Sequence, residues 1–158
     1  MLDRQYIEEN IEIEIICEFL RQKGFDEITP TQEINKYDRF DVYAKKDGYD
    51  YVIETKARSF PHDKYCDILV DKLKLDGYIR RREKNNKLRG LVFNIYNDNT
   101  LACNTITDYF KAAEFMGPKT TAFTNNKYVT KKGVYYKQRH LYKISRKNNN
   151  YEFEEVKK

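Results

Sequence analysis

The pair Asp47-Gly48 places the strongest constraint on how this chain can fold, because residues of high β propensity flank it on both sides. An Asp-Gly pair favours a type I′ turn, which needs a positive φ at both central residues and joins two antiparallel strands. With a two-residue turn there, Asp41 faces Glu54, and like charges so placed destabilise a sheet. A three-residue turn ending at Tyr49 would instead bring Thr55 opposite Asp41. The first arrangement requires something that offsets the repulsion.

A divalent metal ion would offset it. Carboxylate oxygens are hard ligands of the kind that Mg²⁺ or Mn²⁺ prefers, so Asp41 and Glu54 could share one ion. Side chains alternate along a strand, which puts Lys56 on the same face as Glu54. An ammonium group there would orient a water beside the metal and stabilise charge on a phosphate oxygen. The alternative is an exposed hairpin in which Lys56 relieves both acids by surface pairing.

The rest of the chain predicts an α/β fold with a mixed central sheet flanked by helices. Apolar periodicity predicts three helices, at about 4–23, 65–83 and 108–116. Gly24 ends the first of them as a C′ residue. Short β-prone runs predict strands on both sides of Asp47-Gly48 and at about 27–35, 91–96 and 101–106. A length of 158 residues with 40% hydrophobic content suits one domain, 1–158, with a core at about 4–117 and a basic, aromatic β extension at about 118–158.

Charged residues fall on the apolar faces of two predicted helices. In the first helix, Glu8 and Glu12 lie within the apolar arc that Ile11 and the neighbouring isoleucines define, and a carboxylate aimed at a core needs a partner. A small rotation of the helix would leave both acids at a solvated margin. In the second helix, Lys72 falls in the middle of the apolar face and Lys74 does not; a lysine there can also extend its ammonium group into water.

The positive charge of the chain is concentrated near its C-terminus. The chain has 30 Lys and Arg against 25 Asp and Glu, a net charge of +5, and no acidic residue from Phe115 to Tyr151. Such a basic segment fits a polyanion, so we expect DNA as the partner. Tyrosines interleaved in this segment would stack on bases or pack against the protein. The predicted DNA contacts are Lys72, Lys74, Lys131, Lys132, Lys137 and Arg139.

Several other classes of protein are excluded by what the sequence lacks. Three widely spaced cysteines form neither a zinc motif nor a disulfide framework. With only His62 and His140 as bases and no nucleophile elbow around Ser59, a hydrolytic triad is not expected. There is no glycine-rich phosphate loop. No apolar run is long enough to span a membrane and no signal peptide is recognisable, so we expect an intracellular, cytoplasmic protein with no membrane contact.

The motif Phe40-Asp41, followed after the hairpin by "VIETK" at residues 52–56, resembles the PD-(D/E)xK nuclease superfamily. The signature of that superfamily is an acid on one strand and Glu-x-Lys on the next, and the resemblance covers about residues 5–110. Phe40 replaces the common proline before the acid, and no subfamily matches closely. The resemblance implies a restriction-endonuclease-like fold whose first helix sends a glutamate to the metal. It also implies a crossover helix that carries a lysine near the phosphate.

Carried onto this chain, the resemblance implies a metal-dependent endonuclease that hydrolyses phosphodiester bonds in DNA with a metal-activated water. Asp41, Glu54 and Glu8 would hold Mg²⁺ or Mn²⁺, with Glu12 as the reserve ligand, and Lys56 would position the nucleophile. The small size and basic surface are similar to phage or bacterial junction-resolving and DNA-processing enzymes, and a homodimer would let two sites cut a duplex. The alternatives are a non-cleaving nucleic-acid-binding module that keeps the nuclease fold, and an interaction protein whose acidic face binds a basic partner.

Overall fold

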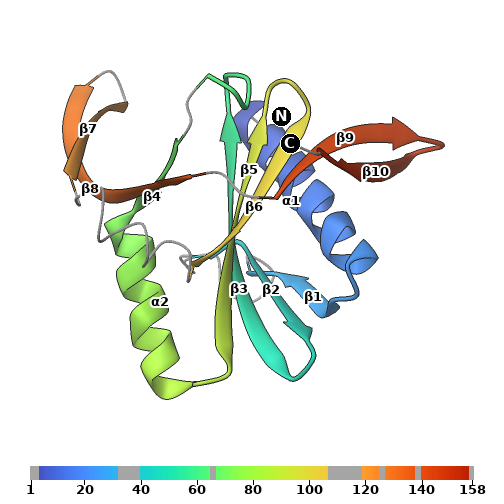
Figure 1. The fold of residues 1–158 in the computed structure, drawn as a ribbon, viewed down its shortest axis with the longest axis horizontal. Coiled ribbons are helices and arrows are strands. Elements are labelled where there is room, and N and C mark those ends of the chain that lie inside the picture. The colour runs from blue at the N-terminus through green and yellow to red at the C-terminus, as the bar shows by residue number, and fades with distance from the viewer. Residues whose placement is uncertain are drawn as a thin grey trace.

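The computed structural model describes residues 4–31, 40–64, 67–106, 119–124, 127–137 and 140–156, with side chains described at 11–31, 40–64, 76–106 and 140–156. Helices lie on both sides of a central sheet (Figure 1). The elements in chain order are α1 (Arg4–Gln22), β1 (Asp26–Pro30), β2 (Val42–Lys46), β3 (Tyr49–Arg58), β4 (Asp67–Asp71), α2 (Lys72–Lys84), β5 (Leu88–Tyr96), β6 (Thr100–Thr105), β7 (Lys119–Thr124), β8 (Lys127–Lys137), β9 (Leu141–Lys147) and β10 (Asn150–Glu155).

The central sheet contains seven strands in the order β1-β2-β3-β5-β6-β9-β10. The pair β3 and β5 is parallel and the other neighbouring pairs are antiparallel. The chain passes from β3 to the parallel β5 through α2, which is the crossover expected of a restriction-endonuclease-like chain. The predicted fold class, a mixed central sheet flanked by helices, is therefore confirmed.

The hairpin at Asp47-Gly48 has the predicted register. β2 and β3 pair from Val42 opposite Ile53 to Lys46 opposite Tyr49. The φ angles of Asp47 and Gly48 are 53° and 81°, both in the left-handed region that a type I′ turn needs. The three-residue turn is excluded because Tyr49 already belongs to the ladder.

Helix α1 ends as predicted, and most of the described part of its predicted apolar arc is buried, with Ile15 at 8% and Phe19 at 4% exposure. Gly24 has a φ of 85° and its N–H bonds to the carbonyl of Arg21, so the C′ assignment is confirmed. Ile11 is 44% exposed, whereas Ile16 and Leu20 are fully buried. Burial therefore extends to the edge of the predicted arc, at Ile16 and Leu20, while Ile11 is exposed.

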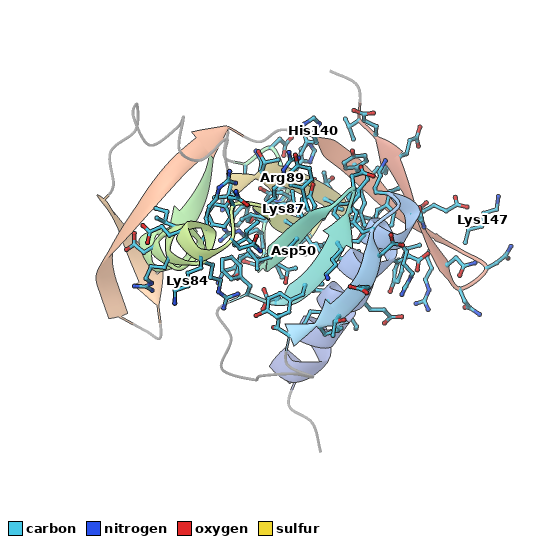
Figure 2. All side chains as sticks on the ribbon, turned by 90° about the horizontal axis from the view of Figure 1, so that it is seen from below. Asp50, Lys84, Lys87, Arg89, His140 and Lys147 are labelled. Atoms are coloured by element: carbon cyan, nitrogen blue, oxygen red, sulfur yellow. The ribbon has the colours of Figure 1, made fainter. Side chains whose placement is uncertain are left out.

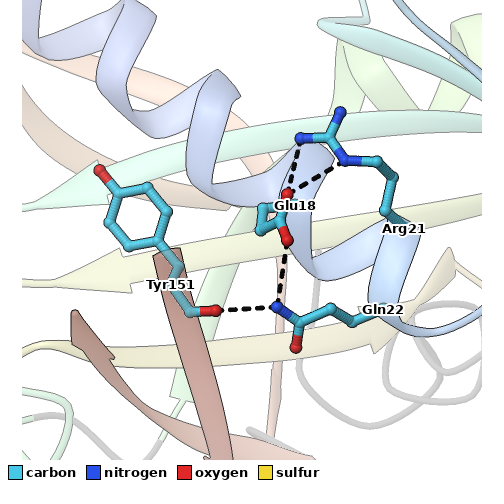
Figure 3. A network of polar contacts seen from close by, with 4 residues as sticks. All are labelled: Glu18, Arg21, Gln22 and Tyr151. Atoms are coloured by element: carbon cyan, nitrogen blue, oxygen red, sulfur yellow. Dashed lines mark hydrogen bonds and ion pairs between the residues drawn. The ribbon is translucent and has the colours of Figure 1, made fainter. Parts of the chain in front are cut away.

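Strands β9 and β10 complete the central sheet and hold α1 in place. β9 pairs with β6, and Phe153 of β10 packs edge-on against Phe19 of α1, with ring centroids 5.1 Å apart. Gln22 donates a hydrogen bond of 2.8 Å from Nε2 to the carbonyl of Tyr151, and it also contacts Glu18 (Figure 3). A hydrogen bond from Arg21 lowers the pKa of the Glu18 carboxyl, which keeps this junction charged. The β extension is confirmed, while the core and extension boundary stays a prediction.

The predicted helix at 65–83 is wrong over its first turn. Residues Asp67–Asp71 form β4, which pairs with β8 in a separate three-stranded sheet, in the order β4-β8-β7. The aliphatic run at 68–70 suits either a strand or a helix, and the partner strand decides between them. The apolar periodicity of this segment predicts Ile79 on the buried face of the helix, but Ile79 is 37% exposed and Tyr78, at 2% exposure, is buried instead. The predicted helix at 108–116 lies outside the described residues.

Two hydrophobic cores lie on opposite faces of the central sheet. Under α2, Tyr78 packs with Val52 and Val92. Under α1, Leu20 packs with Ile53 and other sheet residues. Since Val52 and Ile53 are adjacent in β3, their positions show which side of the sheet each residue of that strand faces.

Candidate active site

Asp41 is fixed at the point where β2 begins. Its N–H donates to the carbonyl of Ile53 at 2.8 Å, one residue out of the ladder register, and its carbonyl accepts from the N–H of Thr31 at 2.9 Å. Its carboxylate Oδ2 accepts the backbone N–H of Thr55 at 2.8 Å and the Thr55 hydroxyl at 3.2 Å. The backbone pairing of β2 and β3 ends at Val42 and Ile53. Beyond that point the Asp41 carboxylate, in place of a backbone carbonyl of β2, accepts the N–H of Thr55.

Glu54 precedes Thr55 in β3 and is only 5% exposed. Alternation from Val52 and Ile53 puts Glu54 and Lys56 on the α2 side of the sheet, with Lys56 exposed. The Asp41 carboxylate thus contacts β3 at Thr55, the residue after Glu54. The Lys56 side chain extends from β3 two residues after Glu54.

The structure gives less detail for the other predicted site residues. Glu8 lies in α1 and Lys72 and Lys74 in the first turn of α2, but their side chains are outside the described set. The same holds for Lys131, Lys132 and Lys137 of β8, and Arg139 lies outside the described residues altogether. Glu12, the reserve ligand, is half-buried one turn before Ile16. The roles of these residues stay predictions.

Sequence reasoning missed a polar row beside Lys56. In the parallel pair β3 and β5, Lys56 lies opposite Asn94, which is fully buried. Arg58, also in β3, donates from Nε to Asn94 Oδ1 at 2.7 Å. Asn94 Nδ2 is buried and has no hydrogen-bond partner within the described part of the chain. The detectable signal was one polar residue inside the apolar run "LVFNIY".

A second polar group lies at the carboxyl ends of β3 and β5. His62 Nδ1 is 2.5 Å from Asp98 Oδ2, and the same oxygen accepts the backbone N–H of His62 at 3.1 Å. Burial alone would raise the pKa of Asp98, but hydrogen bonds from His62 and Thr100 lower it below its usual value. His62, Asp63 and Asp98 each offer one potential ligand atom. These three atoms lie within 4.8 Å of one another, which is close enough to hold a single ion.

The sequence indicated only half of this second group. His62 was weighed as the base of a triad with Ser59, whereas its partner is Asp98 in the turn between β5 and β6. The two residues are far apart in the sequence and meet because β3 and β5 are parallel neighbours that end together. Without the strand order, nothing in the sequence connects them.

No protein-family model and no curated protein matches the chain. Among solved structures, it is similar to Hjc, a Holliday junction resolvase from the archaeal hyperthermophile Archaeoglobus fulgidus. The two are 10% identical, the alignment covers 78% of this chain and 86% of that chain, and the TM-score is 0.47. The fold class rests on the sheet order and on the α2 crossover, and not on this similarity. Among the described helices, none has the length and apolar character needed to cross a membrane.

Proposed function

We propose that the chain is a metal-dependent nuclease that hydrolyses phosphodiester bonds in DNA. One observation carries the proposal: the hairpin register, together with the bond from Thr55 N–H to Asp41 Oδ2, brings the Asp41 carboxylate to the strand position next to Glu54. The exposed Lys56 follows on the face of Glu54. Two acids and an amine in this order can bind a divalent ion and a water beside it.

The residues present fit such an ion. Glu54 is 5% exposed, so an ion held by its carboxylate would be shielded from bulk water. Asp41 and Glu54 offer the oxygen ligands that Mg²⁺ and Mn²⁺ prefer. Glu8 of α1, with Glu12 in reserve, would add a ligand at the sheet edge where the Asp41 carboxylate lies. A bound ion would supply Lewis acidity and a water of lowered pKa.

The chain's own groups would orient the substrate around that ion. Lys56 would hold the attacking water and stabilise charge on the phosphate oxygen. Asn94, opposite Lys56, is fully buried, so its Oδ1 would hold Arg58 in place by accepting from Nε at 2.7 Å. The Arg58 guanidinium would add positive charge on the same strand as Lys56.

The basic residues would hold the phosphate backbone. Gly133 of β8 pairs with Asp71, directly before Lys72, so β8 and the start of α2 are neighbours. The six predicted DNA contacts therefore come from adjoining elements, apart from Arg139, which lies outside the described residues. The logarithm of the DNA-binding constant should fall linearly with the logarithm of the salt concentration, because counterion release contributes much of the affinity.

The test is plasmid nicking and cleavage of linear, single-stranded and four-way-junction DNA, with Mg²⁺, with Mn²⁺ and with EDTA. We expect Glu54→Gln and Lys56→Ala each to reduce the rate at least about 100-fold, the scale of a lost catalytic group. Glu155→Gln is a matched control, because Glu155 is exposed and belongs to the other Glu-x-Lys motif of the chain. Its rate should equal that of the natural chain.

The same assay separates the alternatives. DNA binding that survives both substitutions, with no cleavage of any substrate, would favour the non-cleaving module. Failure to bind DNA at low salt would favour the interaction protein. His62→Ala tests the second group: if it abolishes cleavage while Glu54→Gln does not, the catalytic ion belongs at His62, Asp63 and Asp98. Analytical ultracentrifugation with and without junction DNA tests the expected homodimer.

A further inference from the structure

A pocket of about 470 Å³ opens on the α1 side of the central sheet. Its floor includes Leu91 of β5, which packs in the core under α1, and Tyr51 of β3 forms part of its wall. Tyr51 shares the face of Ile53, so this wall lies across the sheet from Glu54, and Arg82 of α2 reaches the pocket from the other side. Asp41, Glu54 and Lys56 are not among its lining residues, so it is separate from the candidate active site. Phe19 of α1 and Tyr142 of β9 add aromatic walls.

The described rim of this pocket is cationic. The basic side chains that line it are Lys23, Lys46, Arg82, Arg89 and His140, and no acidic residue is among its described lining residues. Lys23 Nζ lies 5.0 Å from the ring centroid of Tyr142. Lys46 Nζ donates to the carbonyl of Lys23 at 2.7 Å, which holds the two lysines beside each other. Figure 2, which looks at the molecule from below, labels Arg89 and His140 among the side chains that line the pocket.

Arg89 is held in place before any ligand arrives. Its guanidinium carbon lies 3.6 Å from the ring centroid of Tyr49, and a side-chain hydrogen bond with Tyr51 raises its pKa. A guanidinium fixed in this way presents its remaining donors as a planar fork, which matches the oxygens of a phosphate. Because the Arg89 side chain is already ordered in the free protein, it loses less conformational entropy when it binds a phosphate.

We propose that this pocket binds a nucleoside phosphate, with the base against the aromatic walls and the phosphate on Arg89 and the two lysines. Apolar walls with a few fixed polar groups are typical of small-molecule sites, and the volume falls within their usual range of about 300–1,000 Å³. Base stacking on aromatic rings and phosphate contact with cations both favour this ligand over a plain anion. The nucleotide is either free or part of a DNA strand, and the proposal does not rest on the nuclease activity.

The experiment is calorimetric titration of the natural chain in metal-free buffer, so that cleavage plays no part. The probes are thymidine 5′-monophosphate, thymidine, inorganic phosphate and a short single-stranded deoxythymidine oligonucleotide. The monophosphate should bind at least about tenfold more tightly than thymidine or inorganic phosphate, because each of these lacks one half of the recognised group. An oligonucleotide that binds more tightly still identifies a strand as the source; equal or weaker binding identifies the free nucleotide.

Arg89→Gln should weaken binding of the monophosphate at least about tenfold, since it removes a charged hydrogen-bond donor. Arg146→Gln is the matched control, because Arg146 also stacks on a tyrosine, 5.5 Å from the ring of Tyr151, but lies outside the pocket. Lys23→Gln should give a smaller loss, and thermal melts check that each variant folds. The proposal is overturned if no nucleotide binds, if inorganic phosphate binds as well as the monophosphate, or if Arg146→Gln and Arg89→Gln weaken binding equally.

Discussion

Gly90 of β5 packs closely against Ile106 and against Tyr78 of α2, and Gly90→Ala tests that packing. An ideal Cβ at this position would lie 2.1 Å from Ile106 Cδ1, 2.7 Å from Ile106 Cγ1 and 3.1 Å from Tyr78 Cε2. Carbon atoms in contact are normally about 3.5–4.0 Å apart, so the Ile106 side chain would have to retreat by roughly 1.4 Å. Ile106 is 1% exposed and Tyr78 is 2% exposed, which leaves little room for that movement.

Two opposing terms set the size of the effect. Overpacking a core costs about 1–3 kcal/mol. Replacing a strand glycine by alanine recovers about 0.5–1 kcal/mol, because alanine loses less backbone entropy on folding. Since the 2.1 Å contact is with a buried side chain, the overpacking term should dominate. We expect Gly90→Ala to lower the free energy of unfolding by about 1–2 kcal/mol, or the melting temperature by about 2–8 °C for a chain of this size.

Urea unfolding followed by circular dichroism measures the effect, and a double-mutant cycle assigns it to Ile106. Ile106→Ala alone should cost about 2–5 kcal/mol through the cavity that it leaves. In the double variant the new methyl group fills part of that cavity, so the combined loss should be smaller than the sum by about 0.5–3 kcal/mol. Gly48→Ala is a control: its φ of 81° makes it costly, yet no atom lies within 4 Å, so Ile106→Ala should not rescue it. Natural stability in Gly90→Ala, or strict additivity with Ile106→Ala, would refute the argument.

Three further predictions concern individual polar groups. Thr55→Val removes the 3.2 Å hydroxyl bond to Asp41 Oδ2 and should slow DNA nicking about 2- to 10-fold, while Thr55→Ser should not; an equal loss in both variants would contradict this. The depressed pKa of Asp98 means that this carboxyl stabilises the fold above about pH 4 and that the stabilisation is lost as the pH falls through its folded-state pKa. Asp98→Asn should therefore flatten the acid limb of stability in urea titrations between about pH 2 and pH 5. Burial raises the pKa of Tyr96 to about 12, so its stabilisation is lost only above about pH 10, and Tyr96→Phe should remove one late-titrating phenol from the ultraviolet titration curve.

The parts of the fold that local chemistry determines were predictable from the sequence. The turn at Asp47-Gly48 depends on two adjacent residues, and the register that follows from it is confirmed along β2 and β3. The end of α1 depends on Gly24 alone. In each case, the backbone conformation of one or two residues is chosen with no help from distant parts of the chain.

Features that depend on a distant partner were not predictable in the same way. Residues 67–71 have a composition that suits a helix or a strand, and only pairing with β8, more than 60 residues later in the sequence, makes them β4. The surroundings of α1 have a similar origin, because Phe19 of this helix packs edge-on against Tyr142 and Phe153 from the end of the chain. A helical wheel contains no information about how wide the sheet beneath the helix is.

The candidate active site combines both kinds of information, which explains why only some of its residues were found. Asp41 and Glu54 flank a short hairpin, so the sequence predicts that they lie near each other, and the structure brings the Asp41 carboxylate to Thr55, the next residue of β3. Asn94 belongs to another strand, and its position opposite Lys56 exists only because β5 returns parallel to β3 after the α2 crossover. A parallel partner strand is separated from its neighbour by a whole crossover, so no sequence spacing announces which residues will meet. In a fold of this kind, residues that meet across a hairpin can be proposed from the sequence, whereas residues that meet across a parallel pair require the strand order.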